Sequence, residues 1–267
     1  MSLRINNNTE AMQAHRQLQA SNARLSHSME KLSSGLRINR AADDAAGLGI
    51  SEKMRGQIRG IAQAQRNIQD GVGMVQTAEG NLDEVHSMLQ RIRELAVEYK
   101  NGSLSTSDRA SIQTEVDQLA SEIERIGSTA AFNGTKLLNA TGTTTFQVGA
   151  NDGEVITIAS ISLGSSVGTS FAALSSGTII ADVDAAIDQV SSARATFGAV
   201  QNRLEHTLSV QATYQENLVA AESRIRDVDM AEEMTKLTKE QILQQAGTAM
   251  LAQANQAPQS VLSLLRS

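Results

Sequence analysis

The sequence predicts a mainly α-helical protein, an elongated antiparallel helical bundle or coiled coil built from the N- and C-terminal segments, with a small β-hairpin insert. Three observations predict this fold class. Apolar residues recur at alternating spacings of three and four towards both ends of the chain, as they do in helices that pack against helices. The 267 residues include one proline, so few positions interrupt a helix. Only the middle of the chain changes to turn residues and β-branched residues.

The first helix is predicted from Leu18, Leu25 and Leu32, which repeat every seven residues. Ser33-Ser34-Gly35 follows this stripe and is predicted to end the helix. An isolated stripe of this kind is stable only when its apolar face is buried, so the first helix needs a partner.

Two further helices are predicted in the N-terminal half. One apolar stripe extends over residues 75–99, and Gly102 is predicted to stop that helix in a left-handed conformation. Residues 105–108 (STSD) supply N-cap oxygens for the next helix, whose stripe covers 112–126. Gly127 is predicted to end it.

The middle and the C-terminal part complete the predicted elements. Residues 146–148 and 155–158 are predicted to form a β-hairpin around the turn sequence GANDG. A long helix is then predicted over 183–228. The last stripe lies in a stretch without charged residues and consists of Leu243, Ala246, Met250, Ala254, Ala257, Val261 and Leu264.

Composition excludes several classes of site. Because the chain has no cysteine, disulfides, cysteine-ligated metals and cysteine nucleophiles are impossible. The four histidines show no metal-ligand spacing, so we expect no metal, no cofactor and no catalytic residues. Residues 71–73 (GVG) resemble the start of a dinucleotide loop, but no strand precedes them.

Charge is distributed unevenly along the chain. Residues 1–66 carry a net charge of +5 and the remainder −11, so the two ends of one chain, or opposite ends of neighbouring copies, can attract each other. The net charge of −6 and the scarcity of aromatic residues, 2%, argue against a nucleic-acid partner. No apolar segment is long enough to predict a membrane partner, and no apolar leader follows Met1, so we expect no cleaved signal peptide.

Several long motifs at the two ends resemble bacterial flagellins. They are residues 32–48 (LSSGLRINRAADDAAGL), 66–71 (RNIQDG), 78–80 (AEG), 133–138 (NGTKLL), 223–233 (SRIRDVDMAEE) and the segment from 253 (QANQ) to Leu265. The resemblance covers about residues 1–140 and 180–267. It implies a short flagellin, whose variable outer part is reduced to the 140–180 insert.

The resemblance implies the function and the partners. A flagellin is the structural subunit of the bacterial flagellar filament: it is not an enzyme, and it assembles with itself into a helical polymer for motility. Expected partners are therefore further copies of the chain, a flagellar export chaperone, the filament cap and the hook-junction proteins. The expected location is the extracellular filament, reached through type III export. A hook–filament junction protein is the alternative.

The resemblance also implies a division of the chain. Residues 1–45 are expected to form an inner-tube helix and loop, 46–180 the outer shell helices with the β-hairpin, 181–225 the returning shell helix, and 226–267 the C-terminal inner-tube helix. The expected inner-tube packing residues are Leu18, Leu25, Leu32, Leu243, Met250, Val261 and Leu264, with an intrachain core as the alternative role.

Two more groups of residues take expected roles from the resemblance. Arg37, Arg40, Asp43 and Asp44 lie in a segment expected to leave the helix and contact neighbouring subunits, the alternative being solvated loop charges. Residues 90–97 (QRIRELAV) match a flagellin segment that is recognised by an animal innate immune receptor. Arg91, Leu95 and Glu115 match the positions expected to contact that receptor, with subunit packing as their other role.

Overall fold

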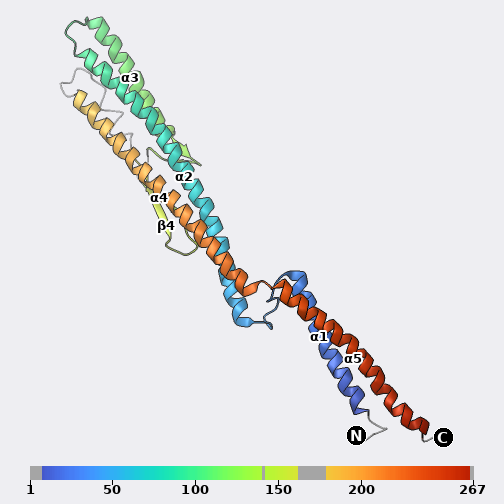
Figure 1. Ribbon diagram of the computed structural model, residues 1–267. Coiled ribbons are helices and arrows are strands. Elements are labelled where there is room, and N and C mark those ends of the chain that lie inside the picture. Colours follow the sequence, from blue (N-terminus) through green and yellow to red (C-terminus); the bar gives the residue numbers. More distant parts are fainter. Residues whose placement is uncertain (1–7, 140–141, 162–178, 265–267) are drawn as a thin grey trace. The chain divides into compact units, whose positions relative to one another are not determined.

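The computed structural model describes residues 8–139, 142–161 and 179–264, and for residues 257–264 it describes the backbone alone. The helices are α1 (Thr9–Ser34), α2 (Ala45–Tyr99), α3 (Thr106–Thr129), α4 (Ile179–Arg226) and α5 (Met230–Leu264) (Figure 1). Between α3 and α4 lie two antiparallel two-stranded sheets, β1 (Ala131–Phe132) with β2 (Thr135–Lys136), and β3 (Thr143–Gln147) with β4 (Val155–Ala159). The predicted fold class, mainly α with a β-hairpin, is confirmed.

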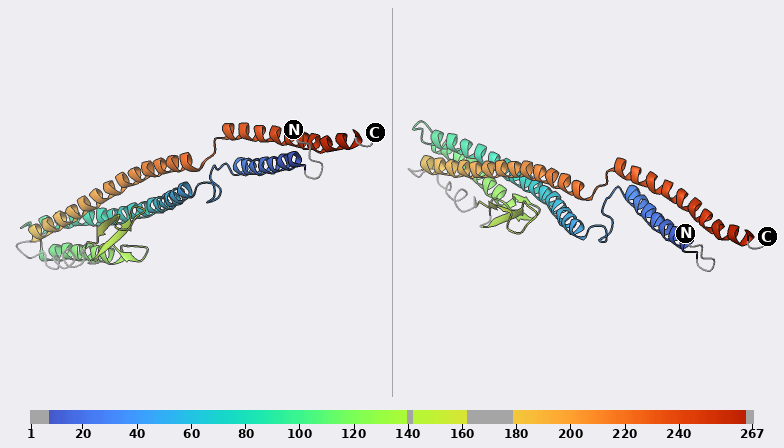
Figure 2. Two further views of the ribbon diagram at one scale, coloured as in Figure 1. Left: turned by 90° about the horizontal axis from the view of Figure 1, so that it is seen from below. Right: turned by 60° about the horizontal axis from the view of Figure 1, so that its bottom comes forward.

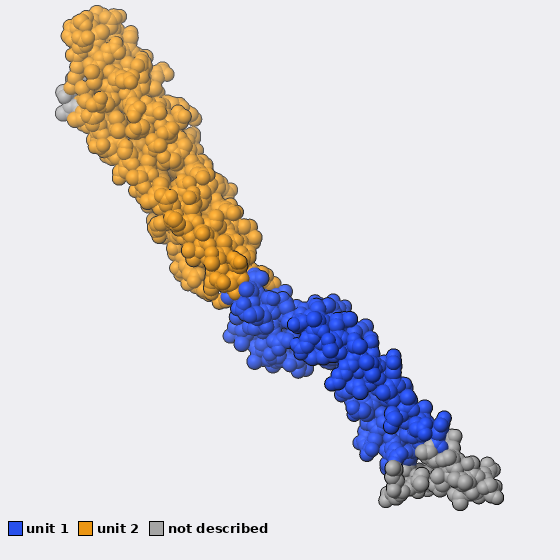
Figure 3. All heavy atoms as spheres, viewed as in Figure 1, with its two compact units in different colours: residues 1–56, 218–267 blue, residues 57–217 orange. Residues whose placement is uncertain are grey.

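The chain divides into two compact units (Figure 3). Unit 1 consists of residues 1–56 and 218–267, and unit 2 consists of residues 57–217. Unit 1 therefore brings the two ends of the chain together, whereas unit 2 is continuous in sequence.

Unit 2 has an apolar core between α2, α3 and α4. Alternating spacings of three and four place Leu82, Val85, Leu89 and Ile92 of α2 on one face, and each is fully buried. The facing helices contribute buried residues at similar spacing, among them Val116, Ile123, Val183, Val190, Phe197 and Leu204.

Ion pairs between helices surround this core. Arg194 Nε of α4 lies 2.8 Å from Glu79 Oε1 of α2, and Arg93 Nε of α2 lies 2.6 Å from Asp184 Oδ1 of α4. The partner of Glu79 is Arg194, whereas the partner of the later Arg93 is the earlier Asp184, so α2 and α4 are antiparallel.

The hairpin of β3 and β4 matches its predicted position. Its register pairs Phe146 with Ile156 and Gln147 with Val155. Ile156 and Ile158 of β4 are buried in the core of unit 2, and the residues of β4 that alternate with them are exposed. This alternation is the reason that the segment folds as a strand against the helices.

Of three helix ends predicted at glycines, one is confirmed and two differ from the prediction. Gly35 has φ of 73° and ends α1 as predicted, because glycine adopts the left-handed conformation without a steric cost. Helix α2 ends at Tyr99, but Gly102 is not left-handed, so the predicted type of stop is wrong. Gly127 is buried inside α3, which continues to Thr129 because this position packs inward instead of turning.

The predicted long helix over 183–228 is also corrected. Helix α4 ends at Arg226, and residues 227–229 form a separate connection to α5. Asp227 forms a β-bridge with Leu36, and Asp229 Oδ1 accepts hydrogen bonds from the N–H groups of Ala231 and Glu232. These bonds begin a new helix and replace the continuation of the old one.

The packing of unit 2 predicts the effect of a core truncation. Leu89→Ala removes a fully buried side chain and is expected to destabilise unit 2 by about 2–5 kcal/mol. Val97→Ala, on the same helix but 51% exposed, is the matched control and is expected to change stability by less than about 0.5 kcal/mol. Urea denaturation followed by helical circular dichroism measures both. Equal effects would contradict the assigned core face of α2.

Candidate assembly surface

Helices α1 and α5 pack side by side in unit 1 and in antiparallel directions (Figures 1 and 2). Near the start of α1, Asn8 Nδ2 donates a hydrogen bond of 2.8 Å to the carbonyl of Ala254. Further along α1, Ser21 Oγ donates one of 2.9 Å to the Glu240 carboxylate. The pair therefore joins segments more than 200 residues apart in sequence.

The residues that face each other form a seam at alternating three and four spacing, which is typical of coiled coils. We call these residues the terminal seam: Ala11, Ala14, Leu18, Ser21, Leu25, Ser28 and Leu32 on α1, with Glu233, Leu237, Glu240, Gln244, Gly247, Leu251 and Ala254 on α5. Every described side chain of α5 outside the terminal seam is exposed.

The terminal seam is unusually polar for a helix pair. Ser21, Ser28 and Glu233 are buried in it, whereas Leu237 is its one buried large apolar side chain among the described residues. Arg24 Nε donates a bond of 3.0 Å to Glu240 Oε1, and this bond is the main reason that the pKa of Glu240 lies below its ordinary value. Because polar residues occupy inner positions of the seam, the pair buries little apolar surface by itself. It therefore gains little stability from this contact.

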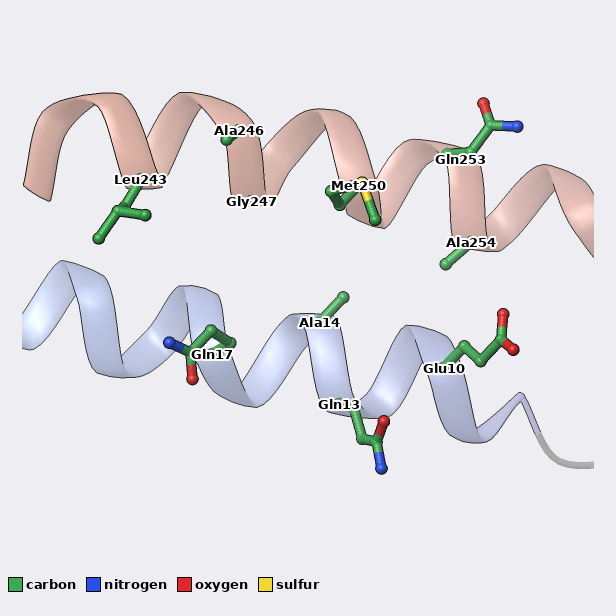
Figure 4. Close-up of a pocket in the computed structure, with 10 residues that line it drawn as sticks. All are labelled: Glu10, Gln13, Ala14, Gln17, Leu243, Ala246, Gly247, Met250, Gln253 and Ala254. Carbon is green, nitrogen blue, oxygen red and sulfur yellow. The ribbon is translucent and has the colours of Figure 1, made fainter.

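A close approach between the helices occurs at Gly247. A Cβ placed on this residue would lie 3.3 Å from Leu18 Cδ1, so a larger side chain would press on α1. Beside this contact, a groove of about 650 Å³ runs between the two helices. Figure 4 shows the side chains of Leu243, Met250 and Ala254 of α5 on the side that faces α1, with Ala14 pointing up from α1.

Unit 1 exposes most of the large apolar side chains that the described residues leave in solvent. Nine of the thirteen such residues belong to it: Met12, Met29, Ile50, Val219, Met230, Met234, Ile242, Leu243 and Met250. Seven of the nine lie on α1 and α5, with Ile50 on α2 and Val219 on α4. Single exposed apolar residues are normal, but a concentration of this kind in one unit indicates a surface that another protein covers.

The structure separates the expected inner-tube residues into three groups. Leu18, Leu25 and Leu32 are half-buried on the terminal seam. Leu243 and Met250 adjoin the seam but remain 41% and 65% exposed. The side chains of Val261 and Leu264 lie outside the described residues.

Sequence reasoning missed the polar members of the seam. Ser21 and Ser28 each lie three residues after a leucine of the seven-residue repeat. They therefore occupy the second inner position of each heptad, and a count of both inner positions finds them. Glu233 and Glu240 could not be found in this way, because charged residues are normally placed on the solvent face of a helix.

The segment between α1 and α2 holds the four expected subunit-contact residues. The N–H of Arg37 donates to the carbonyl of Arg226 at 2.6 Å, and the N–H of Val228 donates to the carbonyl of Gly35 at 3.0 Å. These bonds tie the chain just after α1 to the end of α4 and to the connection that leads into α5. Residues 35–44 leave the helix, as predicted.

Each of the two aspartates has a structural role in its own chain. Asp43 Oδ2 accepts bonds of 3.0 Å from the N–H groups of Asn39 and Arg40, and these bonds lower the pKa of Asp43. Asp44 Oδ1 accepts a bond of 2.8 Å from the N–H of Gly47 and so caps α2. Arg40 Nε lies 3.0 Å from Glu30 Oε1 in an exposed ion pair.

A further ion pair of unit 1 joins the two chain ends. Arg226 Nη1 lies 2.6 Å from Glu52 Oε1, and the side chain of Arg226 is 11% exposed. This hydrogen bond lowers the pKa of Glu52. Lowered pKa values are therefore found for Asp43 and Glu52 near the connection of the two helices and for Glu240 further along α5.

The expected receptor-contact residues lie together in unit 2. Arg91 Nη2 lies 2.9 Å from Glu115 Oε1 of α3, and Arg91 Nη1 lies 3.1 Å from Glu94 Oε2. The bond to Glu115 is the main reason that the pKa of Arg91 is raised. Arg91 and Glu115 are exposed, whereas Leu95 is 2% exposed and belongs to the core.

Two kinds of site are absent from the part of the chain that the structure describes. No group of three or more histidine, aspartate or glutamate residues there is arranged to hold a metal ion. None of the described helices is both long and apolar enough to cross a membrane.

Two family models match the chain. The bacterial flagellin N-terminal helical region matches residues 5–143, and the bacterial flagellin C-terminal helical region matches residues 180–265. The matches therefore cover α1 to α3 at one end and α4 with α5 at the other.

Curated relatives match over nearly the whole chain. The chain is 54% identical to a flagellin of Halalkalibacterium halodurans, over 98% of this chain and 99% of that protein. It is 49% identical to a flagellin of Bacillus subtilis, over 99% of this chain and 100% of that protein. It is also 50% identical to the flagellar filament 33 kDa core protein of Treponema phagedenis, over 98% of this chain and 99% of that protein.

Solved structures share the fold. A crystal structure of Bacillus cereus flagellin matches with a TM-score of 0.51 and 31% identity, over 59% of this chain and 94% of that chain. A putative flagellar hook-associated protein of Vibrio parahaemolyticus matches with a TM-score of 0.53 and 18% identity, over 69% of this chain and 100% of that chain.

Proposed function

The chain belongs to the bacterial flagellin family, and we propose that unit 1 is the part of this filament subunit that neighbouring copies bury. As a flagellin it is a structural protein, not an enzyme, and it self-assembles into the extracellular flagellar filament. The single observation that carries the proposal is the concentration of exposed large apolar side chains on unit 1.

The terminal seam explains why unit 1 needs neighbours. Its buried serines and glutamate leave the helix pair with little apolar burial of its own, while Leu243 and Met250 stay beside it in solvent. A second copy that covers these side chains removes apolar surface from water, which is the main favourable contribution to association. Leu18, Leu25, Leu32, Val261 and Leu264 would pack in the same inner layer.

The connecting segment has a second proposed role. Within its own chain, the segment between α1 and α2 is held in place by the bonds of Arg37, Arg40, Asp43 and Asp44. The Arg40 side chain, which is 66% exposed, also contacts a neighbouring copy. Charges that already form pairs within one chain can still steer the approach of another.

Other partners follow from the family. The subunit would be handed to the flagellar export apparatus by a chaperone, leave the cell without a cleaved signal peptide, and assemble between the hook-junction proteins and the filament cap. A hook–filament junction protein is the alternative function. It would form short oligomers of fixed size, whereas a filament subunit forms long polymers.

A second proposed function is recognition by an animal innate immune receptor. The observation that favours it is the exposed ion pair of Arg91 and Glu115, which places two of the three expected residues on one surface of α2 and α3. The buried Leu95 would support this surface from below and would not contact the receptor itself.

Polymerisation of two variants tests the assembly surface. Leu243→Ser combined with Met250→Ser removes two apolar side chains that are 41% and 65% exposed in the single chain, so the monomer should fold while its critical concentration for polymerisation rises at least tenfold. Loss of about 2 kcal/mol of apolar burial per subunit accounts for such a change. Electron microscopy and sedimentation of seeded monomer measure it.

The matched control for this test is Val210→Ser, which lies in unit 2 and is 65% exposed, as Met250 is. It should polymerise within about twofold of the wild type. Normal filaments from the double variant would sink the proposal for unit 1, and short oligomers from the wild type would favour the junction protein.

Acid is expected to dissolve the filaments. The pKa values of Asp43, Glu52 and Glu240 lie below their ordinary values of 3.8 for aspartate and 4.5 for glutamate. Their stabilising effect is therefore complete above the ordinary values and is lost as the pH falls through the lowered ones. We expect filaments to be stable from pH 7 to about pH 5 and to dissociate progressively below about pH 4.

The variant for this prediction is Glu240→Gln, which keeps a polar partner for Ser21 but does not titrate. Sedimentation of filaments across the pH range should show a shallower acid transition. Glu216→Gln, at an exposed position of α4 with no ion pair among the described residues, is the control and should keep the steepness of the wild type. An unchanged transition in Glu240→Gln would exclude Glu240 as a contributor.

Reporter cells that carry the receptor test the second function. Arg91→Ala monomer is expected to lose at least about tenfold in potency, because the variant removes a charged group and leaves Glu115 unpaired. Arg125→Ala is the matched control, since Arg125 is an exposed arginine of α3 that is also ion-paired, to Glu122. Equal potency of wild type and Arg91→Ala would remove Arg91 from the receptor surface.

A further inference from the structure

Unit 2 contains a hollow of about 400 Å³ between α2 and the two small sheets. Phe132 and Phe146 line it, together with Asp70 and Met74 of α2 and Asn133 of the β1–β2 turn. We call this hollow the aromatic pocket. It takes up two of only four phenylalanines in the chain.

Two glycines of α2 let the rings approach the helix. A Cβ placed on Gly71 would lie 3.4 Å from the ring of Phe146, and one placed on Gly73 would lie 3.9 Å from the ring of Phe132. Glycine inside a helix is unfavourable relative to alanine, so these positions need a packing reason. The sequence GVG at 71–73 is therefore not a nucleotide loop; it lies within α2, beside the two rings.

The turn between β1 and β2 forms another part of the pocket wall. Asn133 and Gly134 have φ of 47° and 81°, so the chain reverses in two left-handed residues between β1 and β2. This reversal holds Phe132 at the edge of the hollow. Both rings are half-buried, so their remaining surface is available to a ligand.

Asp70 determines the charge of the ligand. It is exposed at the pocket and makes no ion pair or hydrogen bond among the described residues. One such carboxylate in a pocket that two aromatic rings also line suits a guanidinium or an ammonium group, which a carboxylate attracts and ring faces also attract.

The chain itself offers such groups. Residues 1–66 carry a net charge of +5. Within that segment Arg16, Lys53, Arg59 and Arg66 are exposed, and none has an ion pair in the part of the chain that the structure describes. The Arg66 guanidinium donates to Gln63 of its own chain, which leaves the other three as candidates. Arg59 precedes Asp70 by eleven residues on α2, about 16 Å along the helix, so it does not reach the pocket of its own chain.

We propose that the aromatic pocket is an assembly contact that accepts one of these three basic side chains from a second copy of the chain. The proposal rests on the proposed self-assembly, because that assembly supplies the second copy. Repetition of such a contact between different surfaces of successive copies suits an open helical polymer.

Charge reversal at the pocket is the first test. Asp70→Lys should raise the critical concentration for seeded polymerisation about tenfold at low salt, because it places like charges together. Asp188→Lys is the matched control: Asp188 is exposed on α4 without an ion pair among the described residues, and its reversal should change the critical concentration less than about twofold. Circular dichroism of the monomers shows whether each variant is folded.

Where Asp70→Lys does not fold, Asp70→Asn is decisive, because it keeps the shape of the side chain and removes only the charge. It should raise the critical concentration about threefold and make polymerisation less sensitive to salt. Assembly of a folded Asp70 variant with the wild-type critical concentration and salt dependence would overturn the proposal.

A charge swap identifies the donor. Asp70→Lys is combined in turn with Arg16→Glu, Lys53→Glu and Arg59→Glu. One of the three combinations should restore polymerisation to within about twofold of the wild type, because it re-forms an opposite-charge pair between copies. Restoration by none of the three would overturn the proposal.

Polymerisation of the wild type distinguishes failure of the pocket contact from failure of self-assembly. If the wild type does not form filaments, the proposed self-assembly fails and the pocket contact fails with it. If the wild type forms filaments and the charge of Asp70 has no effect on them, the pocket contact alone fails.

Discussion

The polar terminal seam is the constraint on which the rest of this structure depends. Helices α1 and α5 meet at a complete heptad register, yet serines and glutamates occupy several of its inner positions. The Ser21–Glu240–Arg24 group satisfies its hydrogen bonds within the pair, so it specifies the register without adding much stability. The pair therefore buries little apolar surface of its own, and the proposed burial by other copies would add to it.

Unit 2 solves the opposite problem. Its three long helices bury continuous apolar stripes, and the hairpin of β3 and β4 adds two isoleucines to the same core. It is therefore stable as part of a single chain and keeps few large apolar residues in solvent. Unit 1, by contrast, leaves nine large apolar side chains exposed, and this difference is the basis of the proposal that neighbouring copies bury it.

The connections between the elements hold the two chain ends together. Backbone bonds between residues 35–37 and 226–228, with the Arg226–Glu52 pair beside them, align α1 with α5 at the base of the pair. The bond from Arg226 lowers the pKa of Glu52, and the N–H groups of Arg40 and Asn39 lower the pKa of Asp43, so both carboxylates near this connection favour the ionised form.

The sequence by itself determined the helical fold class, the position of the β-hairpin, the end of α1 at Gly35 and the family, because apolar periodicity, turn residues and long motifs are local properties. It also placed Arg37, Arg40, Asp43 and Asp44 outside the helices. Only the tertiary structure decided that Glu240 and Glu233 face α1, that Leu243 and Met250 lie beside the seam, and that Asp70 and two distant phenylalanines share a pocket. These facts depend on which side of a helix meets a partner far away in the chain. A heptad pattern shows that a partner exists, but the hydrogen bonds that select its register form only when both helices are in place.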